Sequence, residues 1–311
     1  MLPRFVASFH SVIRTVVATI AAAGALFLSD DILGQGQIAE PVYRVANEAV
    51  AVQPGTAVAA AAPAPASLEA AVSLDFTQQA GEHPLAPVIR VSKASLEHID
   101  RNIRDYSATL VKQERVNGDL SEHQHIFVKI RHEPFSVYMS FLKPFQGREV
   151  VYVDGQNDNQ LVVLEAGLKR MLGKMTLAPD GMVAMRGQKH PITKVGIRNL
   201  TAQLIRRFEA DTQYAECEVM TDPAKKVNGR PATLVQIVHP IPRKNFYAHV
   251  TRIFFDNELR IPIHYDVYMW PDQPGGQPPL EESYTYTNLK VNNGYSARDF
   301  DAHNNPEIFK Q

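Results

Sequence analysis

Two neighbouring apolar runs between Arg148 and Gly167 constrain the fold more than any other feature of the chain. Val150 to Val153 and Leu161 to Leu164 flank a polar turn that opens with Asp154-Gly155. An Asp-Gly turn between apolar runs predicts a β-hairpin. Antiparallel hairpins usually have one apolar and one polar face, but consecutive apolar residues give this hairpin two apolar faces. The sequence therefore predicts strands that are covered on both sides.

Strand patterns continue along most of the chain after residue 107. The stretches "HQHIFVKIR" and "FSVYMSFL" alternate in polarity, and further strand patterns occur in "ATLVQIVH", "AHVTRIFFD", "IPIHYDVYMW" and "ESYTYTNLKV". Turn dipeptides such as Asn117-Gly118 and Asn228-Gly229 separate them. Many strands at short spacing, divided by such turns, predict a meandering antiparallel sheet or barrel.

Three helical segments accompany the strands. Ser95 is a favourable N-cap for the first, whose apolar residues recur at spacings of three and four: Leu96, Ile99, Ile103 and Tyr106. The second is short and lies within residues 165–175. The third covers residues 192–213 and places Ile197, Leu200, Leu204 and Phe208 on one face. The first and third are amphipathic, so we expect them to pack on the sheet.

The N-terminal region has the pattern of an export signal. Arg4 and Arg14 accompany fourteen uninterrupted apolar residues, Thr15 to Leu28. This run fits a signal peptide and is shorter than the ~20 residues of a membrane-spanning helix. We predict a signal peptide within residues 1–39, with an uncleaved N-terminal anchor as the alternative.

An Ala/Pro-rich segment separates the N-terminal region from the rest of the chain. Residues 40–91 contain "GTAVAAAAPAPASLEAAV" and few large apolar side chains. Such a composition buries too little apolar surface to offset the entropy of ordering the chain. We therefore predict a disordered linker over residues 40–91 and a folded domain over residues 92–311.

The charge balance and the single cysteine exclude several classes of protein. A net charge of −1 and a pI near 6.8 give none of the basic excess typical of nucleic-acid binding. Cys217 cannot form an intramolecular disulfide or a zinc site built on several cysteines. The sequence has no Gly-rich phosphate loop, no Gly-x-Ser-x-Gly and no His-Glu-x-x-His. We predict a non-enzymatic protein without a cofactor or a bound metal.

A few polar residues still allow a chemical role. His123 and His125 share one strand face and could bind a metal, or form a solvated strand start. His264 and Asp266 have the same spacing and could form a catalytic dyad, or a hydrogen-bonded pair on a strand. A nucleophilic Cys217 would need exposure and a nearby base, and the sequence indicates neither, so we predict a buried thiol.

Charged pairs occur in several places. Glu281-Glu282 precedes the last strand and is predicted to be a solvated pair. Arg206-Arg207, Lys225-Lys226 and Arg243-Lys244 could form a basic patch for anionic head groups, although such pairs usually lie on solvated faces. These pairs do not define a function by themselves.

A strongly curved sheet with helices inside its concavity would cover the hairpin better than flat two-layer packing. The order of segments, from "YSATLVKQER" through "PFSVYMSFLKPFQGREVVYVDG" to "NLKVNNGYSARDFD", resembles the periplasmic lipoprotein-carrier superfamily of LolA, LolB and the RseB sensor domain. It resembles more closely an uncharacterised bacterial domain-of-unknown-function family with that fold. The resemblance covers residues 92–309 and implies an α+β fold, a strongly curved antiparallel open half-barrel closed by helices. An insertion that holds Met171 to His190 is longer than the superfamily leads us to expect.

The resemblance also implies a function. It implies an exported protein, periplasmic or tethered to the inner membrane by an uncleaved N-terminus, that binds a hydrophobic ligand such as a lipid, an acyl chain or a lipoprotein. Strand residues that alternate away from polar partners would line its cavity: Ile126, Val128, Ile130, Phe135, Val137, Met139, Phe141, Tyr265, Val267 and Met269. The alternative is a membrane-tethered envelope sensor or scaffold that contacts a protein partner. A hydrolase of lipid or glycan is the third possibility.

Overall fold

The computed structural model describes residues 73–214 and 216–309, which form twelve strands, two α-helices and four short 3-10 segments. The strands are β1 (Asp105–Val116), β2 (Asp119–Leu120), β3 (Gln124–Arg131), β4 (Ser136–Lys143), β5 (Glu149–Val153), β6 (Leu161–Leu164), β7 (Lys174–Leu177), β8 (Glu218–Val227), β9 (Arg230–Val238), β10 (Val250–Asp256), β11 (Pro262–Tyr268) and β12 (Leu280–Val291). The helical segments are α1 (Ala86–Asn102), α2 (Ile197–Asp211), η1 (Asn157–Asn159), η2 (Gly167–Leu172), η3 (Ile192–Lys194) and η4 (Ala297–Phe300). The predicted signal peptide or anchor, residues 1–39, lies outside the described residues.

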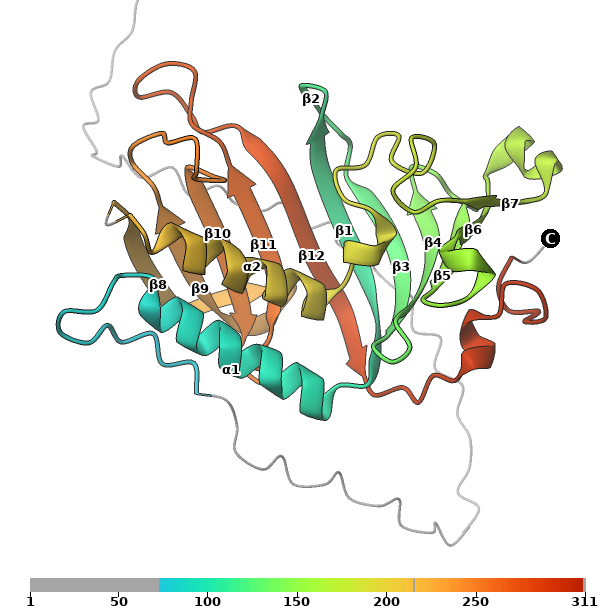
Figure 1. Cartoon of the computed structure of the whole chain (residues 1–311), viewed down its shortest axis with the longest axis horizontal. Coiled ribbons are helices and arrows are strands. Elements are labelled where there is room, and N and C mark those ends of the chain that lie inside the picture. The colour runs from blue at the N-terminus through green and yellow to red at the C-terminus, as the bar shows by residue number, and fades with distance from the viewer. Residues whose placement is uncertain (1–72, 215, 310–311) are drawn as a thin grey trace, which may run out of the picture. The chain divides into compact units, whose positions relative to one another are not determined.

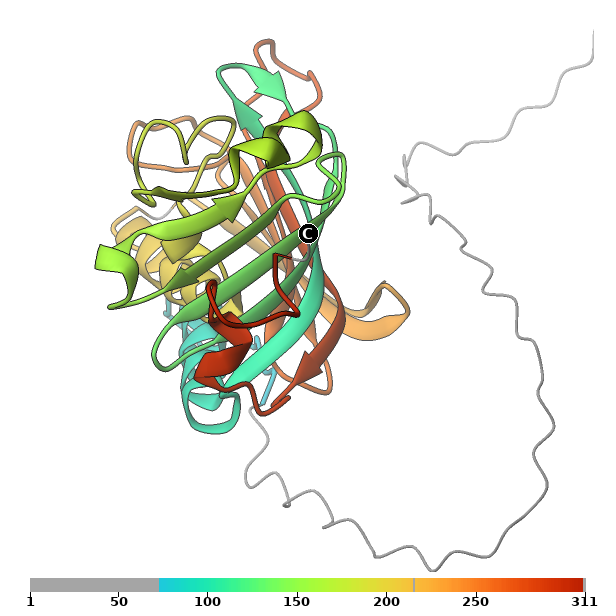
Figure 2. The same cartoon turned by 90° about the vertical axis from the view of Figure 1, so that its right-hand side faces the viewer.

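All twelve strands belong to one antiparallel sheet. Eleven of them follow the order β7-β6-β5-β4-β3-β1-β12-β11-β10-β9-β8, and β2 pairs with β1 beside this path. The sheet is open, because β7 and β8 end it and do not pair with each other within the described part of the chain. It curves around α1 and α2, which lie on its concave face (Figure 1, Figure 2). The predicted fold class, an α+β open half-barrel closed by helices, is confirmed.

The two α-helices cover one half of the concave face. Leu85 and Val88 at the start of α1, and Leu204 and Phe208 on α2, are almost completely buried. Beneath them lies a filled apolar core from β9, β10 and β11: Val235, Ile237, Ile253, Phe255, Tyr265 and Val267. Full burial of one such side chain contributes ~1.5–3 kcal/mol, so this half of the sheet is well stabilised.

The first helix begins earlier than the sequence predicts. α1 starts at Ala86, with Pro87 in the first turn, where its missing N–H costs nothing. Ser95 is therefore not an N-cap: it lies inside the helix, fully buried, and its hydroxyl donates a hydrogen bond to the carbonyl of Arg260 at 2.8 Å. The missed signal is Val88, which extends the apolar stripe towards the N-terminus.

The predicted boundary between linker and domain at residue 92 is corrected in the same way. Leu74 and Phe76 pack against the core beneath the helices, and the rings of Phe76 and Phe255 lie 5.6 Å apart. These two large apolar side chains are exceptions within an Ala/Pro-rich stretch, and together with the fully buried Leu85, Val88 and Val91 they help to offset the entropy of ordering residues 73–91. Residues 40–72 of the predicted linker lie outside the described residues.

A glycine divides the helical segment that the sequence predicts over residues 192–213. Gly196 separates η3 from α2 and has a φ of +112°, which L side chains rarely adopt. A Cβ at this position would lie 3.1 Å from the hydroxyl oxygen of Tyr106. That hydroxyl accepts a hydrogen bond from the N–H of Ile197 at 2.8 Å, so a β1 residue fixes the start of α2.

The short helix predicted within residues 165–175 is only partly correct. Residues 167–172 form the 3-10 segment η2 and not an α-helix, and Gly173, with a φ of +72°, ends it. The chain then forms β7, which pairs with β6 as the edge strand of the sheet. The predicted insertion at residues 171–190 therefore begins at this edge and ends beside β12, where His190 contacts Glu282.

The C-terminal segment covers the outer face of the hairpin formed by β5 and β6. Residues 295–309, which we call the C-terminal strap, pack on the outer face of β4, β5 and β6 (Figure 2). They bury the alternate hairpin residues Val151, Val153, Val162 and Leu164. Phe300, Ile308 and Phe309 of the strap exclude water from this outer face, as expected for strands that are covered on both sides. The strap does not cover Val163 and its neighbours, which lie on the inner face of the hairpin.

Candidate ligand-binding cavity

The half of the concave face that α1 and α2 leave uncovered holds a cavity of about 600 Å³. Its floor consists of β1 and β3 to β7, and its roof consists of residues 179–196 together with the first turns of α2. Known sites for small molecules have volumes of about 300–1,000 Å³. The cavity is therefore within the size range of sites that hold one small molecule.

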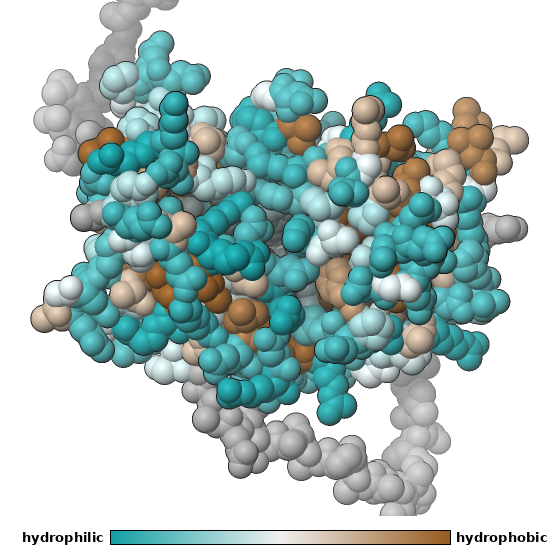
Figure 3. All heavy atoms as spheres, in the orientation of Figure 1, coloured by the Kyte–Doolittle hydropathy of each residue, from teal (hydrophilic) through white to brown (hydrophobic). Residues whose placement is uncertain are grey.

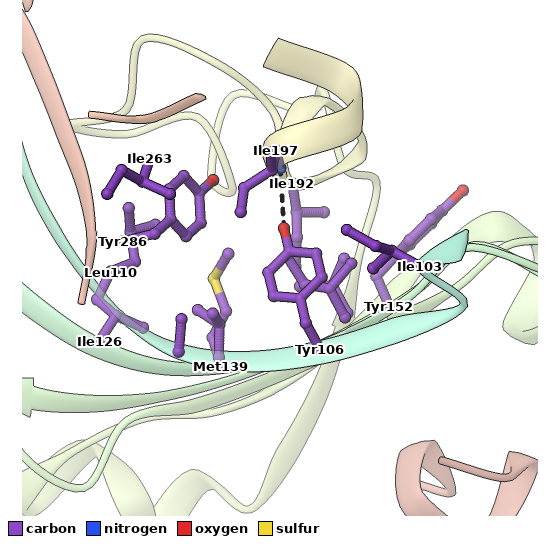
Figure 4. Packing of buried hydrophobic residues seen from close by; sticks show 14 of the residues in the cluster. Ile103, Tyr106, Leu110, Ile126, Met139, Tyr152, Ile192, Ile197, Ile263 and Tyr286 are labelled. Carbon is purple, nitrogen blue, oxygen red and sulfur yellow. Dashed lines mark hydrogen bonds between the residues drawn. The ribbon is translucent and has the colours of Figure 1, made fainter. Parts of the chain in front are cut away.

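Two rows of apolar residues form the floor of the cavity. Leu110, Ile126 and Phe141 are direct neighbours across β1, β3 and β4. The second row crosses β4 to β7 and contains Met139, Val150, Val163 and Met175. Figure 4 shows several of these side chains on the strands, with Ile192 and Ile197 opposite them. Because strand side chains alternate between faces, both rows point into the concavity.

Four of the ten residues predicted to bind a ligand line this cavity. They are Ile126, Met139, Phe141 and Tyr265. Val128, Ile130 and Val137 lie on the same face of β3 and β4, but they are completely buried in the core. Strand alternation identified the correct face and could not tell which part of it another element fills.

The remaining three predicted residues lie away from the cavity. Val267 is completely buried in the core beneath the helices. Phe135 lies just before β4 and packs against Tyr152, with ring centroids 6.2 Å apart. Met269 follows the end of β11, is half-buried, and donates its N–H to the carbonyl of Pro279. None of the three lines the cavity.

One side of the cavity is polar and almost completely buried. Lys112 and Glu114 on β1 form an ion pair at 3.0 Å, and Glu282 on β12 accepts a hydrogen bond from Nε2 of His190 at 2.8 Å. All four residues line the cavity, together with Tyr284. Glu114 and Glu282 have exposed fractions of only 2% and 1%, so both carboxylates depend on protein partners and not on water. We call these five residues the polar cluster.

One hydroxyl group joins the two carboxylates of the polar cluster. The oxygen of Tyr284 lies 2.7 Å from Oε1 of Glu114 and 3.0 Å from Oε2 of Glu282. Burial, together with the negative charges of Glu282 and Glu114, raises the pKa of Tyr284 far above its usual value, so the hydroxyl keeps its proton. A hydroxyl has one proton to donate, so it can bond to only one carboxylate at a time.

A half-buried arginine stabilises the carboxylate of Glu282 from the side of α2. Arg207 lies 3.7 Å from Oε1 of Glu282 and stacks on the ring of Tyr247, whose hydroxyl donates to the same oxygen at 2.8 Å. Burial alone would raise the pKa of Glu282, but His190, Tyr247 and Arg207 together lower it below its usual value. Glu282 is therefore ionised at neutral pH.

The prediction that Glu281-Glu282 is a solvated pair before the last strand is wrong for Glu282. Glu282 is not a solvated charge: it lies within β12 and points to the concave face, like Tyr284 and Tyr286 two and four residues later. That period of two was visible in the sequence. The predicted basic patch does not form either, because Arg207 is half-buried beside Glu282 and Arg243 pairs with Glu216.

The remaining polar candidates do not line the cavity. Nε2 of His264 and Oδ2 of Asp266 lie 2.9 Å apart, which confirms the hydrogen-bonded pair. Cys217 is buried, and burial together with the charge of Asp211 raises the pKa of its thiol to about 11, which suppresses the thiolate. Across the described residues, no group of three His, Cys, Asp or Glu side chains could hold a metal ion. The same residues contain no helix that is long and apolar enough to cross a membrane.

The fold and the site together define a class of protein: an open antiparallel half-barrel with an internal cavity that is apolar on one side and charged on the other. Residues 103–309 match the model of a family described as a protein of unknown function, DUF1571. The chain belongs to this family. No curated protein matches the sequence.

Several solved structures are similar in fold. A DUF1329 family protein from Desulfovibrio piger is 10% identical, with coverage of 71% of this chain and 98% of that chain and a TM-score of 0.36. The MucA/MucB complex of Pseudomonas aeruginosa gives 17% identity, 68% and 60% coverage, and a TM-score of 0.38. The LolA superfamily protein NE2245 from Nitrosomonas europaea gives 7% identity, 67% and 96% coverage, and a TM-score of 0.20. Similarity at this level assigns no ligand and no partner.

Proposed function

We propose that the protein binds an amphipathic lipid without transforming it, with the acyl chain of the lipid in the cavity. The observation that carries this proposal is a lipid-sized hollow on the inner face of a sheet whose outer face is sealed by the C-terminal strap. Plain core packing would have filled this space, because protein interiors are packed about as densely as organic crystals.

The two sides of the cavity suit the two parts of such a ligand. An acyl chain would contact the floor, where the row through Met139 and Val163 is apolar from β4 to β7. Each buried methylene contributes ~0.8 kcal/mol, so ten of them contribute ~8 kcal/mol before the cost of association. The polar part of the lipid would lie towards Glu114 and Tyr284, where carboxylate and ammonium groups offer hydrogen bonds.

The proposal includes a location in the cell envelope. The pattern of residues 1–39 favours export, with the domain acting outside the cytoplasm. Sequencing the N-terminus of the mature protein tests this. Retention of residues 12–28 would favour the alternative, a tethered sensor or scaffold, over a freely diffusing lipid carrier.

Native mass spectrometry of the purified full chain, followed by organic extraction, tests the lipid itself. We expect a co-purified acyl species that a fluorescent fatty-acid probe can displace. A ligand-free spectrum together with no binding of the probe would contradict the proposal.

Two adjacent residues of β6 provide a matched pair of variants. Val163 points into the cavity and Val162 points outwards beneath the strap. Val163→Phe should fill part of the cavity, and if it displaces two methylenes it weakens probe binding ~15-fold. Val162→Phe should overpack the outer core, which costs ~1–3 kcal/mol of stability, and leave the probe affinity of the folded protein unchanged. Equal probe affinity in both variants would show that the probe does not use the cavity.

A further inference from the structure

Two loops at the edge of the sheet surround the opening of the cavity. They are residues 142–148, which comprise the end of β4 and the turn to β5, and residues 167–191, which run from η2 through β7 to the start of η3; we call them the rim loops. A guanidinium nitrogen of Arg170 donates to the carbonyl of Gly147 at 3.0 Å and joins the two. Phe145 and Val183 line the cavity and are also solvent-exposed, so the cavity opens to solvent between the rim loops.

The rim loops concentrate the exposed apolar side chains of the described residues. Seven of the ten large exposed hydrophobic side chains belong to them: Leu142, Phe145, Leu168, Met171, Leu172, Met182 and Val183. Met182 is 91% exposed and Met171 is 88% exposed, which is far beyond the partial exposure of an ordinary surface residue. Figure 3 shows hydrophobic residues at the surface beside β7. A concentration of this kind marks an interaction site.

The rim loops are also strongly basic. They contain seven Lys or Arg residues and one acidic residue, Asp180, although the chain as a whole has a net charge of −1. Arg148 and Lys189 form ion pairs with glutamates outside the rim loops. The other five cations of the rim loops have no carboxylate at ion-pair distance within the described part of the chain: Lys143, Lys169, Arg170, Lys174 and Arg186. Apolar side chains are thus interspersed with unneutralised positive charge.

We propose that the rim loops dock the protein on the surface of an anionic lipid bilayer, with the opening of the cavity towards the membrane. Exposed Leu and Met side chains beside Lys and Arg are typical of surfaces that insert into the interfacial region of a bilayer. A bilayer also requires no shape complementarity, which suits side chains that project separately from two loops. Docking deepens the proposed function and rests on it, because an acyl chain could then pass between bilayer and cavity without crossing water.

A fluorescent probe on the rim loops tests docking directly. The full chain with Met182→Cys would be labelled with an environment-sensitive fluorophore, while the buried Cys217 remains unlabelled. The matched control is Met220→Cys, because Met220 is exposed on β8, away from the rim loops. The local readout is independent of any membrane contact made by residues 1–39.

We expect lipids that carry a quencher to quench the probe at position 182 in vesicles of phosphatidylcholine and phosphatidylglycerol, and not the probe at position 220. Removing two cations with Lys143→Gln and Lys169→Gln should raise the lipid concentration for half-maximal quenching ~30-fold, since each cation near an anionic surface accounts for about fivefold. The control pair Lys226→Gln and Lys244→Gln should change nothing. Absence of quenching at position 182, or equal quenching in vesicles of phosphatidylcholine alone, would overturn the proposal in favour of a protein partner.

The docking surface and the cavity can fail separately. Met171→Ser with Met182→Ser removes two exposed side chains that do not line the cavity. This variant should lose vesicle quenching of a probe at position 168, placed there as Leu168→Cys, and keep its affinity for the fatty-acid probe. Normal quenching in this variant would contradict docking through the rim loops. If the chain without these serine substitutions shows vesicle quenching but does not bind the fatty-acid probe, that result would contradict the proposed function alone.

Discussion

Asp211→Asn should stabilise the protein at alkaline pH. Asp211 is the last residue of α2, with an exposed fraction of 7%, and its Oδ2 lies 3.6 Å from Nε2 of His239. Nδ1 of His239 donates to the carbonyl of Ala248, which leaves Nε2 as an acceptor without a hydrogen-bond partner among the described residues. Burial raises the pKa of Asp211 to about 6, against the opposing influence of Arg207 and His83. The protonated carboxyl can donate to Nε2, and the carboxylate cannot.

The size of the effect follows from the two pKa values of Asp211. A rise from the usual 3.8 to about 6 means that the folded state holds the proton more tightly. One pKa unit corresponds to 1.36 kcal/mol, so ionisation of Asp211 costs the folded state ~3 kcal/mol. The free energy of unfolding should therefore fall as the pH rises from about 4 to 6 and then level off. The amide that Asp211→Asn introduces carries no charge and would donate to His239 at every pH.

Urea denaturation monitored by circular dichroism at a series of pH values measures the difference. We expect the free energy of unfolding of Asp211→Asn to exceed that of the unmodified protein by up to ~3 kcal/mol near pH 8. This difference should disappear towards pH 4. Asp222→Asn is the control, because Asp222 is half-buried on β8, away from His239, and forms its own hydrogen bonds there. A variant that is less stable than the unmodified protein at pH 8, or a gain that does not change with pH, would refute the reasoning about Asp211.

Two further predictions concern other buried positions. Gly196→Ala should lower the free energy of unfolding by ~1–3 kcal/mol, because Gly196 has a φ of +112° and a Cβ there would lie 3.1 Å from the hydroxyl of Tyr106; unchanged urea unfolding would contradict this. Asp256→Asn should destabilise the protein at neutral pH, because Arg230 and two backbone N–H groups outweigh burial and hold the pKa of Asp256 below its usual 3.8. The stability that this carboxylate provides is complete above about pH 4 and is lost as the pH falls through its lowered pKa, so the advantage over Asp256→Asn should shrink in acid; a constant advantage would be inconsistent with this pKa.

Local patterns were sufficient to predict most of the sheet, but not its two edge strands, β7 and β8. Ile126 and Val128 on β3, and Val137 and Met139 on β4, alternate with more polar residues in the sequence, and all four face the concave side in the structure. The Asp154-Gly155 turn likewise predicted the hairpin of β5 and β6. These features depend on residues close together in the chain, so the sequence displays them directly.

The elements that cover the sheet depend on distant residues and were harder to predict. Val162 is buried by Phe300 and Ile308, which lie more than 130 positions later in the chain and show no pattern that refers back to β6. For the same reason, alternation could not separate Ile126, which faces the cavity, from Ile130, which is packed in the core. The face of a strand is a local property, and the neighbour that covers it is not.

The polar cluster shows the limit of reasoning from charge. Glu282 and Tyr284 have the period of an inward-facing strand, but a glutamate in that pattern is expected to be solvated unless its partners are known. Those partners, Arg207 and His190, come from α2 and from the roof of the cavity. Their approach is a consequence of the tertiary fold, because 75 or more residues separate each from Glu282 in the chain.

One buried carboxylate links the C-terminal strap to the cavity-bearing half of the sheet, in addition to the apolar packing between them. Glu149 accepts a hydrogen bond from the hydroxyl of Tyr138 at 2.9 Å and one from the N–H of Phe309 at 2.7 Å, both at the same oxygen. Proteolytic removal of residues 300–309 would expose an apolar outer surface on β5 and β6. It would also remove one of the two hydrogen-bond donors to the Glu149 carboxylate. The outer face of β5 and β6 would then be apolar and exposed, while their inner face borders the cavity. Such strands are poorly protected against association with a second copy of the chain. Cleavage within residues 300–309 would thus lower the solubility of the protein before the rest of the molecule unfolded.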